Sequence, residues 1–440
     1  MIGRKGKKLS SDVVRDSVNT FGTNAVGAVL TLIQTFAVMR RVNLQVKGNY
    51  NAFQTWSSGF LTILGLSITS SVIYFVARYK IQNTRAALTK VTGGVFAAIL
   101  VVSGVILVAL RNSSFFRDMP VNFLVAMVVN ALLCLILNVF VGVLRGENKF
   151  KSFNIINLVQ RIVTMVLALY IAFRPSATIW IWGTNVIAAA AILLALYGMR
   201  RWNGPMPQPI PEDDHPATAG GIVTYSLKSH VSMVLTFCNT YLGNYIVQGQ
   251  YGISNLAVYS TALTIAQQLK ILPDAVSQVI MSRIAAMSAE KDRLRLTLIA
   301  SKAVTYVTAV AALVLYWAAK VFVPLIFPIY TGSLEPLPYL VAGFIFISCA
   351  TVLNNSIAAY GKPELNIIPT ALGIAASCVS YFIFIPLMGM NGVAVATALS
   401  MTMQGVSSMV IFCLFTHTPA YRLIIPSKEE IASVRGLFKR

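Results

Sequence analysis

About twelve long apolar runs follow one another along this chain of 440 residues. Each has the roughly 20 residues that cross the hydrocarbon core of a bilayer as a helix. The composition agrees, with 56% hydrophobic and only 11% charged residues, against roughly 25% charged in soluble domains. The sequence therefore predicts an all-α polytopic membrane protein and excludes a soluble fold. The expected spans lie near residues 13–39, 52–77, 90–110, 119–144, 153–173, 178–199, 223–248, 256–284, 297–320, 336–360, 364–386 and 391–416.

The chain also divides into two similar halves. Residues 203–222 form a linker rich in proline and acid, which separates six spans in residues 1–202 from six in residues 223–440. Short patterns recur in the same order in both halves. In the first half they are Leu137-Asn138, Gly146, Lys149 and Asn154, and in the second Leu353-Asn354, Gly361, Lys362 and Asn366. Likewise, the stretch from Thr55 to Arg78 resembles that from Thr261 to Arg283. We expect two pseudo-symmetric six-helix bundles, inserted in parallel with the substrate path between them.

The formal net charge of +21 arises from 35 basic and 14 acidic residues. If the N-terminus is cytoplasmic, most of the basic residues fall in cytoplasmic loops and termini. The outer loops then hold only Arg40, Arg41, Lys47, Arg111, Arg117 and Arg174. This bias follows the positive-inside rule and predicts that both termini and the linker are cytoplasmic. The charge therefore needs no nucleic-acid partner.

Several kinds of chemistry find no support in the sequence. There is no Gly-rich phosphate loop of the Walker type, and the only acidic run, Glu212 to Asp214, lies in the linker. The five cysteines lie singly inside apolar runs, and the three histidines have no metal-site spacing. The loops are too short for an extramembrane catalytic domain. We therefore expect a transporter that is not an enzyme and uses no cofactor or metal.

Three segments carry a family resemblance. Residues 252–287 place a small-residue turn before a helix with a mid-span proline, Pro273, and a basic end at Arg283. Residues 137–163 form a hairpin with a Gly-bearing basic loop, and residues 354–400 contain a proline-then-glycine turn at Pro386 and Gly389. Together these segments resemble polysaccharide and O-antigen flippases (Wzx-type), within the multidrug/oligosaccharidyl-lipid/polysaccharide (MOP) exporter superfamily.

The resemblance implies a function in surface polysaccharide biosynthesis, including lipopolysaccharide. The expected substrate is a polyprenyl-pyrophosphate-linked oligosaccharide, flipped by alternating access from the cytoplasmic to the periplasmic face of the bacterial inner membrane. A glycan polymerase and chain-length machinery are expected partners. The sequence leaves the oligomeric state open.

Such a substrate requires a cationic, hydrated path for its pyrophosphate. Because a cation inside a span costs about 2.5–3.5 kcal/mol on insertion scales, basic residues in the spans are functional candidates. Arg161 is the strongest, because a guanidinium cannot lose its charge and suits bidentate phosphate binding. Lys270 lies halfway along the eighth span. Lys228 and Lys302 either line the path or extend to the interface, and Arg40 either receives the pyrophosphate or marks the interface.

Four further residues are candidates for coupling or gating. Asp274 follows Lys270 by one helical turn, so the two side chains either act in transport or neutralise each other. Pro273 removes one backbone hydrogen bond and is a plausible hinge. His230 is either a titratable group or a packing residue, and Asp16 is expected to pair with Arg15 at the cytoplasmic mouth.

Other functions stay open. A drug/cation antiporter of the same superfamily needs an acidic cavity, whereas the charges within these spans are mainly positive. A lipid II flippase is closer in substrate, although that branch usually has fourteen spans. A membrane glycan polymerase or ligase is the alternative from another class, distinguished by accumulation of translocated but unpolymerised glycan when the gene is deleted.

Overall fold

The computed structural model describes residues 22–23, 26–27, 29–31, 33–78, 81–147, 149–201, 218–287 and 289–425. In these ranges the regular structure is helical, without strands. Eight helices are long and apolar enough to cross a membrane, and α2 and α3, bent by 52° relative to each other, together make a ninth. The prediction of an all-α polytopic membrane protein is confirmed. The cytoplasmic location of the termini stays a prediction.

The helices of the first half are α2 (Leu44–Leu64), α3 (Ile68–Arg78), α4 (Ile81–Ala109), α5 (Val121–Gly146), α6 (Phe150–Phe173) and α7 (Ala177–Arg201). Residues 33–41 before them are also helical. Then follow α8 (Ala219–Gln267), the 3-10 turn η1 (Gln268–Lys270), α9 (Ile271–Ala286), α10 (Glu290–Ile326) and η2 (Pro328–Leu334). The chain continues with α11 (Leu337–Ala359), η3 (Pro363–Asn366), α12 (Ile367–Met388), α13 (Met390–Thr416) and the short α14 (Tyr421–Ile424).

The chain forms two compact units. Unit 1 comprises residues 1–234 with 248–254, and unit 2 comprises residues 235–247 with 255–440. Helix α8 therefore contributes residues to both units. The linker expected at residues 203–222 lies mostly outside the described residues, so the division of the chain at that linker stays a prediction.

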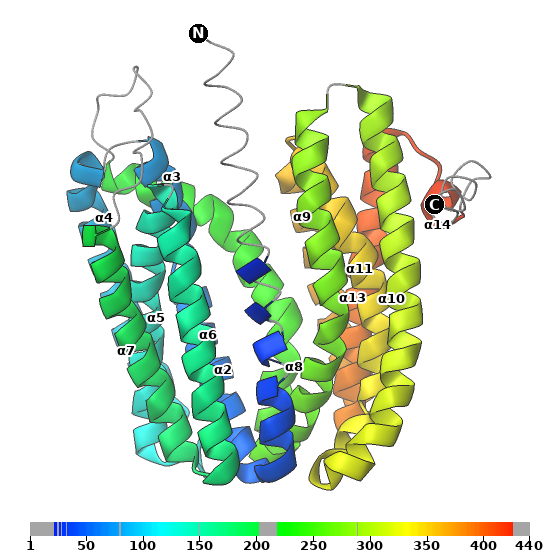
Figure 1. Cartoon of the computed structure of the whole chain (residues 1–440). Coiled ribbons are helices and arrows are strands. Elements are labelled where there is room, and N and C mark those ends of the chain that lie inside the picture. The colour runs from blue at the N-terminus through cyan, green and yellow to red at the C-terminus, as the bar shows by residue number, and fades with distance from the viewer. Residues whose placement is uncertain are drawn as a thin grey trace. The chain divides into compact units, whose positions relative to one another are not determined.

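Helix α5 is the centre of unit 1, since it packs against α2, α3, α4, α6 and α7. Figure 1 shows α4, α5, α6 and α7 as neighbouring helices of this unit. Two glycines spaced by four, Gly142 and Gly146, let α3 approach α5 closely. A Cβ atom at Gly146 would lie 2.8 Å from the side chain of Val76. Small residues at this spacing are a common helix interface in membranes, where close backbone contact replaces hydrophobic driving force.

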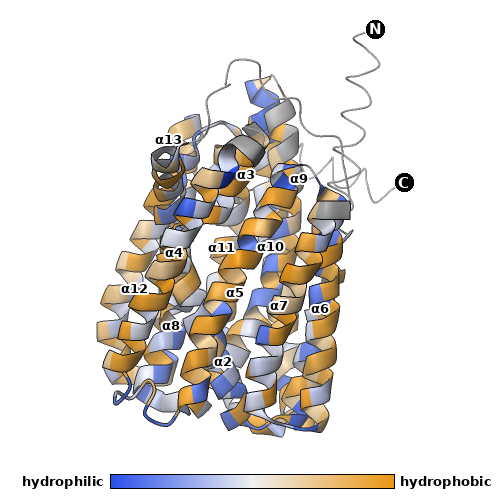
Figure 2. Ribbon diagram, turned by 90° about the vertical axis from the view of Figure 1, so that its left-hand side faces the viewer, coloured by the Kyte–Doolittle hydropathy of each residue, from blue (hydrophilic) through white to orange (hydrophobic). Residues whose placement is uncertain are grey.

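Helix α11 has the corresponding place in unit 2, where it packs against α9, α10 and α13. Glycines again allow the close approach. A Cβ atom at Gly343 would lie 2.9 Å from the Ala398 backbone, and one at Gly405 would lie 2.8 Å from the Phe346 carbonyl oxygen. Figure 2 shows that apolar residues dominate the helices, with hydrophilic residues interspersed.

The sequence patterns that recur in the two halves are matched by similar backbone hydrogen bonds after α5 and α11. After α5, the Lys149 amide donates to the Leu144 carbonyl at 2.8 Å. After α11, the Lys362 amide donates to the Ile357 carbonyl at 3.2 Å, again across five residues. This closure satisfies a carbonyl that a helix end leaves without a partner. The two helix ends that the sequence pattern relates therefore close in the same way.

Three local features differ from the simple picture of separate straight spans. The second span begins at Leu44 rather than near residue 52, and it is broken between α2 and α3. The seventh and eighth expected spans join without a loop in α8, where Gly252 has a φ of +82°. The eighth span is interrupted again at η1. The expected turn after Pro386 is present, with Gly389 at a φ of +58°.

Candidate functional site

Arg161 lies on a polar stripe of α6. Asn154, Asn157, Arg161 and Thr164 follow one another at intervals of three or four residues, so they share one face of the helix. The exposed apolar residues of α6 lie on the opposite side; they are Val159, Ile162, Val163, Val166, Tyr170 and Phe173. An apolar exposed face of a spanning helix is the one suited to lipid. Arg161 is itself exposed, yet it is on the polar side of α6.

The guanidinium of Arg161 lies against Gly27, a buried residue of the first span. A methyl group added to Gly27 would overlap the Nη1 atom of Arg161 and lie 2.5 Å from its Cζ atom. Glycine at position 27 therefore leaves the space that the guanidinium occupies. Sequence reasoning missed this role, because it depends on how the first span meets α6.

The second span of unit 1 breaks at Gly65, Leu66 and Ser67. Leu66 and Ser67 have φ angles of +49° and +46°, a backbone region that residues other than glycine rarely adopt. Each such residue costs on the order of 1–3 kcal/mol and persists only where the surroundings hold it. A Cβ atom at Gly65 would overlap the Leu61 carbonyl oxygen, so the break also requires glycine there.

His230 of α8 holds this break. Its Nε2 atom lies 3.0 Å from the Ile63 carbonyl oxygen in the last turn of α2. Because a carbonyl only accepts, Nε2 donates this hydrogen bond. The Nδ1 atom lies 3.4 Å from the Ser67 hydroxyl, which is also 3.1 Å from the Met233 sulfur. The imidazole thus contacts both the last turn of α2 and the last residue of the break.

The second span of unit 2 is interrupted by η1, which ends at Lys270, with Pro273 following in the first turn of α9. Lys270 and Asp274 are both half-buried, and the Lys270 ammonium interacts electrostatically with the Asp274 carboxylate. One turn further, the Ser277 hydroxyl accepts a 2.8 Å hydrogen bond from Asn355 of α11. Lys270, Pro273 and Asp274, three of the residues predicted from sequence, therefore lie together at this interruption.

The two interruptions are adjacent but do not overlap when the two halves are aligned on Thr55 and Thr261. Gly65 follows Thr55 by ten residues, and Ile271 follows Thr261 by ten. The break in unit 1 begins at Gly65, and α9 begins at Ile271, directly after η1. Interrupted helices at matching or adjacent positions of two repeats point to a binding or coupling site in secondary transporters.

The other predicted residues have different surroundings. Lys302 of α10 is buried, and its ammonium donates to the Ile425 carbonyl oxygen at 3.5 Å. Arg40 is exposed at the end of the first span. Lys228 lies within α8, but its side chain is outside the described part of the structure, as is Asp16.

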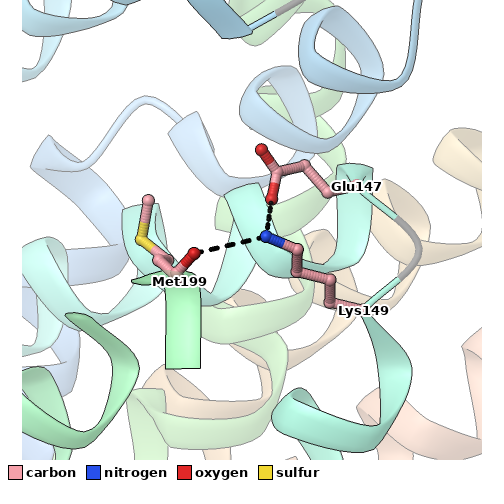
Figure 3. A network of polar contacts seen from close by, with 3 residues as sticks. All are labelled: Glu147, Lys149 and Met199. Atoms are coloured by element: carbon pink, nitrogen blue, oxygen red, sulfur yellow. Dashed lines mark hydrogen bonds and ion pairs between the residues drawn. The ribbon is translucent and has the colours of Figure 1, made fainter. Parts of the chain in front are cut away.

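Lys149, in the turn between α5 and α6, contacts groups close to it in unit 1. Its ammonium lies 2.8 Å from a Glu147 carboxylate oxygen and 3.4 Å from the Met199 carbonyl oxygen, as Figure 3 shows. Both charged side chains are nearly buried. A cation at the carbonyl end of a helix stabilises that end, so Lys149 joins the turn to α7.

Unit 2 contains a buried polar network without charge. Asn239 of α8 donates to Gln404 at 2.6 Å and accepts a short hydrogen bond from Ser400, both in α13. Gln404 in turn donates to Thr370 of α12 at 3.1 Å. These contacts assign Asn239 to bonding between helices. Within the described residues, no group of three or more His, Cys, Asp or Glu side chains could hold a metal ion.

Comparison with solved structures finds the same fold in transporters. The lipid II flippase MurJ in an inward closed conformation aligns with a TM-score of 0.66 and 13% identity, covering 93% of this chain and 89% of that one. An inward-facing multidrug resistance MATE family transporter of the MOP superfamily aligns with a TM-score of 0.61 and 14% identity, covering 90% and 95%. A MOP superfamily transporter from Pyrococcus furiosus aligns with a TM-score of 0.57 and 16% identity, covering 93% and 96%.

Comparison with curated protein sequences finds no match. A family profile does match, over residues 80–329, and its description is "Polysaccharide biosynthesis protein". This range is more than half of the chain, and it contains both Arg161 and the interrupted span with Lys270. The chain is a multi-pass membrane protein with the fold of MOP transporters, and it belongs to the polysaccharide biosynthesis protein family.

Proposed function

We propose that this protein is a flippase that moves a polyprenyl-pyrophosphate-linked oligosaccharide, an O-antigen or other surface polysaccharide repeat unit, across the inner membrane. It releases the glycan at the periplasmic face for a polymerase and its chain-length machinery. The family match supports a role in polysaccharide biosynthesis, and the fold supports transport by alternating access. The observation that carries the substrate class is the position of Arg161.

A lipid-linked glycan needs a cation for its pyrophosphate at a place away from the acyl chains. Arg161 meets both requirements, since it lies on the polar stripe of α6 and opposite the exposed apolar face. Its guanidinium can form two parallel hydrogen bonds with phosphate oxygens. Asn154 and Asn157 on the same stripe offer amide groups suited to sugar hydroxyls.

In unit 2, Lys270 is our second candidate for contact with the anionic group. Lys270 is the last residue of η1, so a change in the angle between α8 and α9 would move its side chain. The Asp274 carboxylate, one helical turn away, attracts the Lys270 ammonium. Lys302, by contrast, has its ammonium 3.5 Å from the Ile425 carbonyl oxygen next to α14, which supports a role in packing.

The charge of the described spans weighs against a drug/cation antiporter. Such a protein needs a carboxylate without a cation beside it to attract a cationic substrate. Asp274, the acid we find in mid-span among the described residues, has Lys270 one turn away. The charges therefore favour an anionic substrate.

The test uses a strain in which the gene is deleted and the native glycan is followed. Deletion is expected to trap the lipid-linked glycan at the cytoplasmic face, where a membrane-impermeant glycosidase added to spheroplasts cannot cleave it. Accumulation of a cleavable, unpolymerised glycan would instead indicate a polymerase or ligase and contradict the proposal.

Variants of Arg161 test the site within this assay. Arg161→Ala is expected to lower surface glycan at least tenfold at normal protein level, while Arg161→Lys keeps part of the activity because it retains the charge without the bidentate geometry. The matched control is Arg145→Ala in α5, whose guanidinium lies over the Phe153 ring at 5.2 Å. Unchanged surface glycan in Arg161→Ala would remove Arg161 from the substrate path.

A further inference from the structure

We propose that the break in the second span of unit 1 is a hinge, and that His230 is the latch that holds it in the position seen here. His230 is a positioning residue in this scheme, since it acts through the backbone of α2 and α3. The proposal rests on the proposed transport function only where it gives the hinge a role in transport; the latch itself does not depend on that function.

The backbone shows why the break needs a latch. Two consecutive residues, Leu66 and Ser67, have positive φ angles, and neither is a glycine. Such a conformation returns to a more common one unless the surroundings fix it. The break also leaves carbonyl groups at the end of α2 without the amide partners that a continuous helix would supply.

The His230 side chain supplies both missing restraints. Its Nε2 atom donates a hydrogen bond to the Ile63 carbonyl before the break, and its Nδ1 atom faces the hydroxyl of Ser67, the last residue of the break. The contact continues along the same faces of α3 and α8. The hydroxyl groups of Ser71 and Ser226 are 2.6 Å apart, and the rings of Tyr74 and Tyr225 stack at 4.5 Å.

The interruption at η1 in unit 2 has different contacts. There the Gln268 side chain donates to the Thr264 carbonyl at 2.9 Å, within the same helical segment. That hydrogen bond is local to the span, and one turn beyond Asp274 the span also accepts a hydrogen bond from Asn355 of α11. In unit 1 the hydrogen bond to the break comes from His230 of α8. In unit 1, therefore, a movement of α8 would release the break.

Helix α8 is suited to pass on such a movement. Residues 219–234 of this helix, which include His230, belong to unit 1, and residues 235–247 belong to unit 2. A rearrangement of unit 2 that pulls on α8 would thus withdraw the imidazole from Ile63 and Ser67. The geometry makes His230 the link between a change in one unit and the bend of a span in the other.

Hydrogen exchange of the full-length protein in nanodiscs, followed by mass spectrometry, tests the latch without any substrate. In His230→Ala, amides of residues 64–70 are expected to exchange about tenfold faster, as follows from the loss of one hydrogen bond to the Ile63 carbonyl. His230→Gln is expected to exchange like the wild type, because its side-chain amide can donate to Ile63 and accept from Ser67. The matched control is Ser226→Ala, on the same face of α8, which should leave the break protected.

Equal exchange in the wild type and His230→Ala would overturn the latch, and so would an equal acceleration in Ser226→Ala, since the effect would then be general loosening of α8. If His230→Ala does not fold, Ser67→Ala carries the same test against Ser71→Ala, with acceleration expected only in the former.

Surface glycan provides the second readout. His230→Ala is expected to lose export and His230→Gln to restore it. Export that is equally lost in both variants would contradict a latch that works by hydrogen bonding. If the deletion strain shows no glycan defect at all, the proposed function fails, while the exchange result still decides whether the latch exists.

Discussion

The guanidinium of Arg161 lies directly against the backbone of Gly27, in the space where any other residue would place its side chain. Through this contact, α6 packs against the first span at Arg161, the residue that the sequence indicates most strongly as a phosphate ligand. The position of the charge is therefore set by a residue that carries no chemistry of its own.

Substitution of Gly27 is expected to act through Arg161. Gly27→Val should lower surface glycan about as strongly as Arg161→Ala, because the β-branched side chain takes the place of the guanidinium, and Gly27→Ala should have a weaker effect. Surface glycan is measured per amount of inserted protein.

The matched control for Gly27 is Gly104→Ala in α4, where no atom lies within 4 Å of the added Cβ. Alanine there should be neutral or slightly stabilising, since it favours the helix by up to about 1 kcal/mol. Normal export by Gly27→Val would mean that Arg161 works without the contact to the first span.

Lys270 and Asp274 lend themselves to a double-mutant cycle. Each single change to alanine should lower thermal stability in detergent, because it leaves a half-buried charge without compensation, and the double change should recover about 1–3 kcal/mol of that loss. Export, however, should stay low in the double variant if Lys270 contacts the substrate. Recovery of both stability and export would show that the two residues only neutralise each other.

Lys302 is expected to matter for structure and not for export. Lys302→Met keeps the volume but loses the hydrogen bond to Ile425, so the segment around α14 should become more sensitive to protease. Leu423 of this segment is buried in a cluster with Leu298 and Phe412, which should keep the loss to about 1–2 kcal/mol. Lys320→Met, at an exposed lysine over the Trp317 ring, is the control. Lost export with unchanged protease resistance would return Lys302 to the substrate path.

The eight helices and the broken pair α2–α3 that are long and apolar enough to cross a membrane were predictable from sequence, because length and apolarity alone define them. The interruption at η1 was partly predictable, since Pro273 removes a backbone donor. The break at Leu66 and Ser67 was not, because these residue types carry no signal for a positive φ and Gly65 is one glycine among many. What fixes that break is His230, which lies 163 residues from Ser67 in the sequence.

The candidate site was predictable in residue type but only partly in role. The spacing of Asn154, Asn157, Arg161 and Thr164 is visible in the sequence and already favours one polar face. The contact of Arg161 with Gly27 depends on the packing of two helices, which no local pattern encodes. For Lys302, the sequence left open the interface or the substrate path, and it held no signal for the contact of its ammonium with the Ile425 carbonyl oxygen, 123 residues away.

The sharing of α8 between the two units bears on how the protein is made. Trp56 of α2 donates to Gln248, and Gln248 donates to the Phe115 carbonyl, so unit 1 contains contacts that the chain supplies only after residue 247 has been synthesised. The first six spans therefore leave the ribosome before their own bundle can be completed. A fragment that stops at the linker should consequently insert into the membrane yet remain a substrate for quality-control proteases.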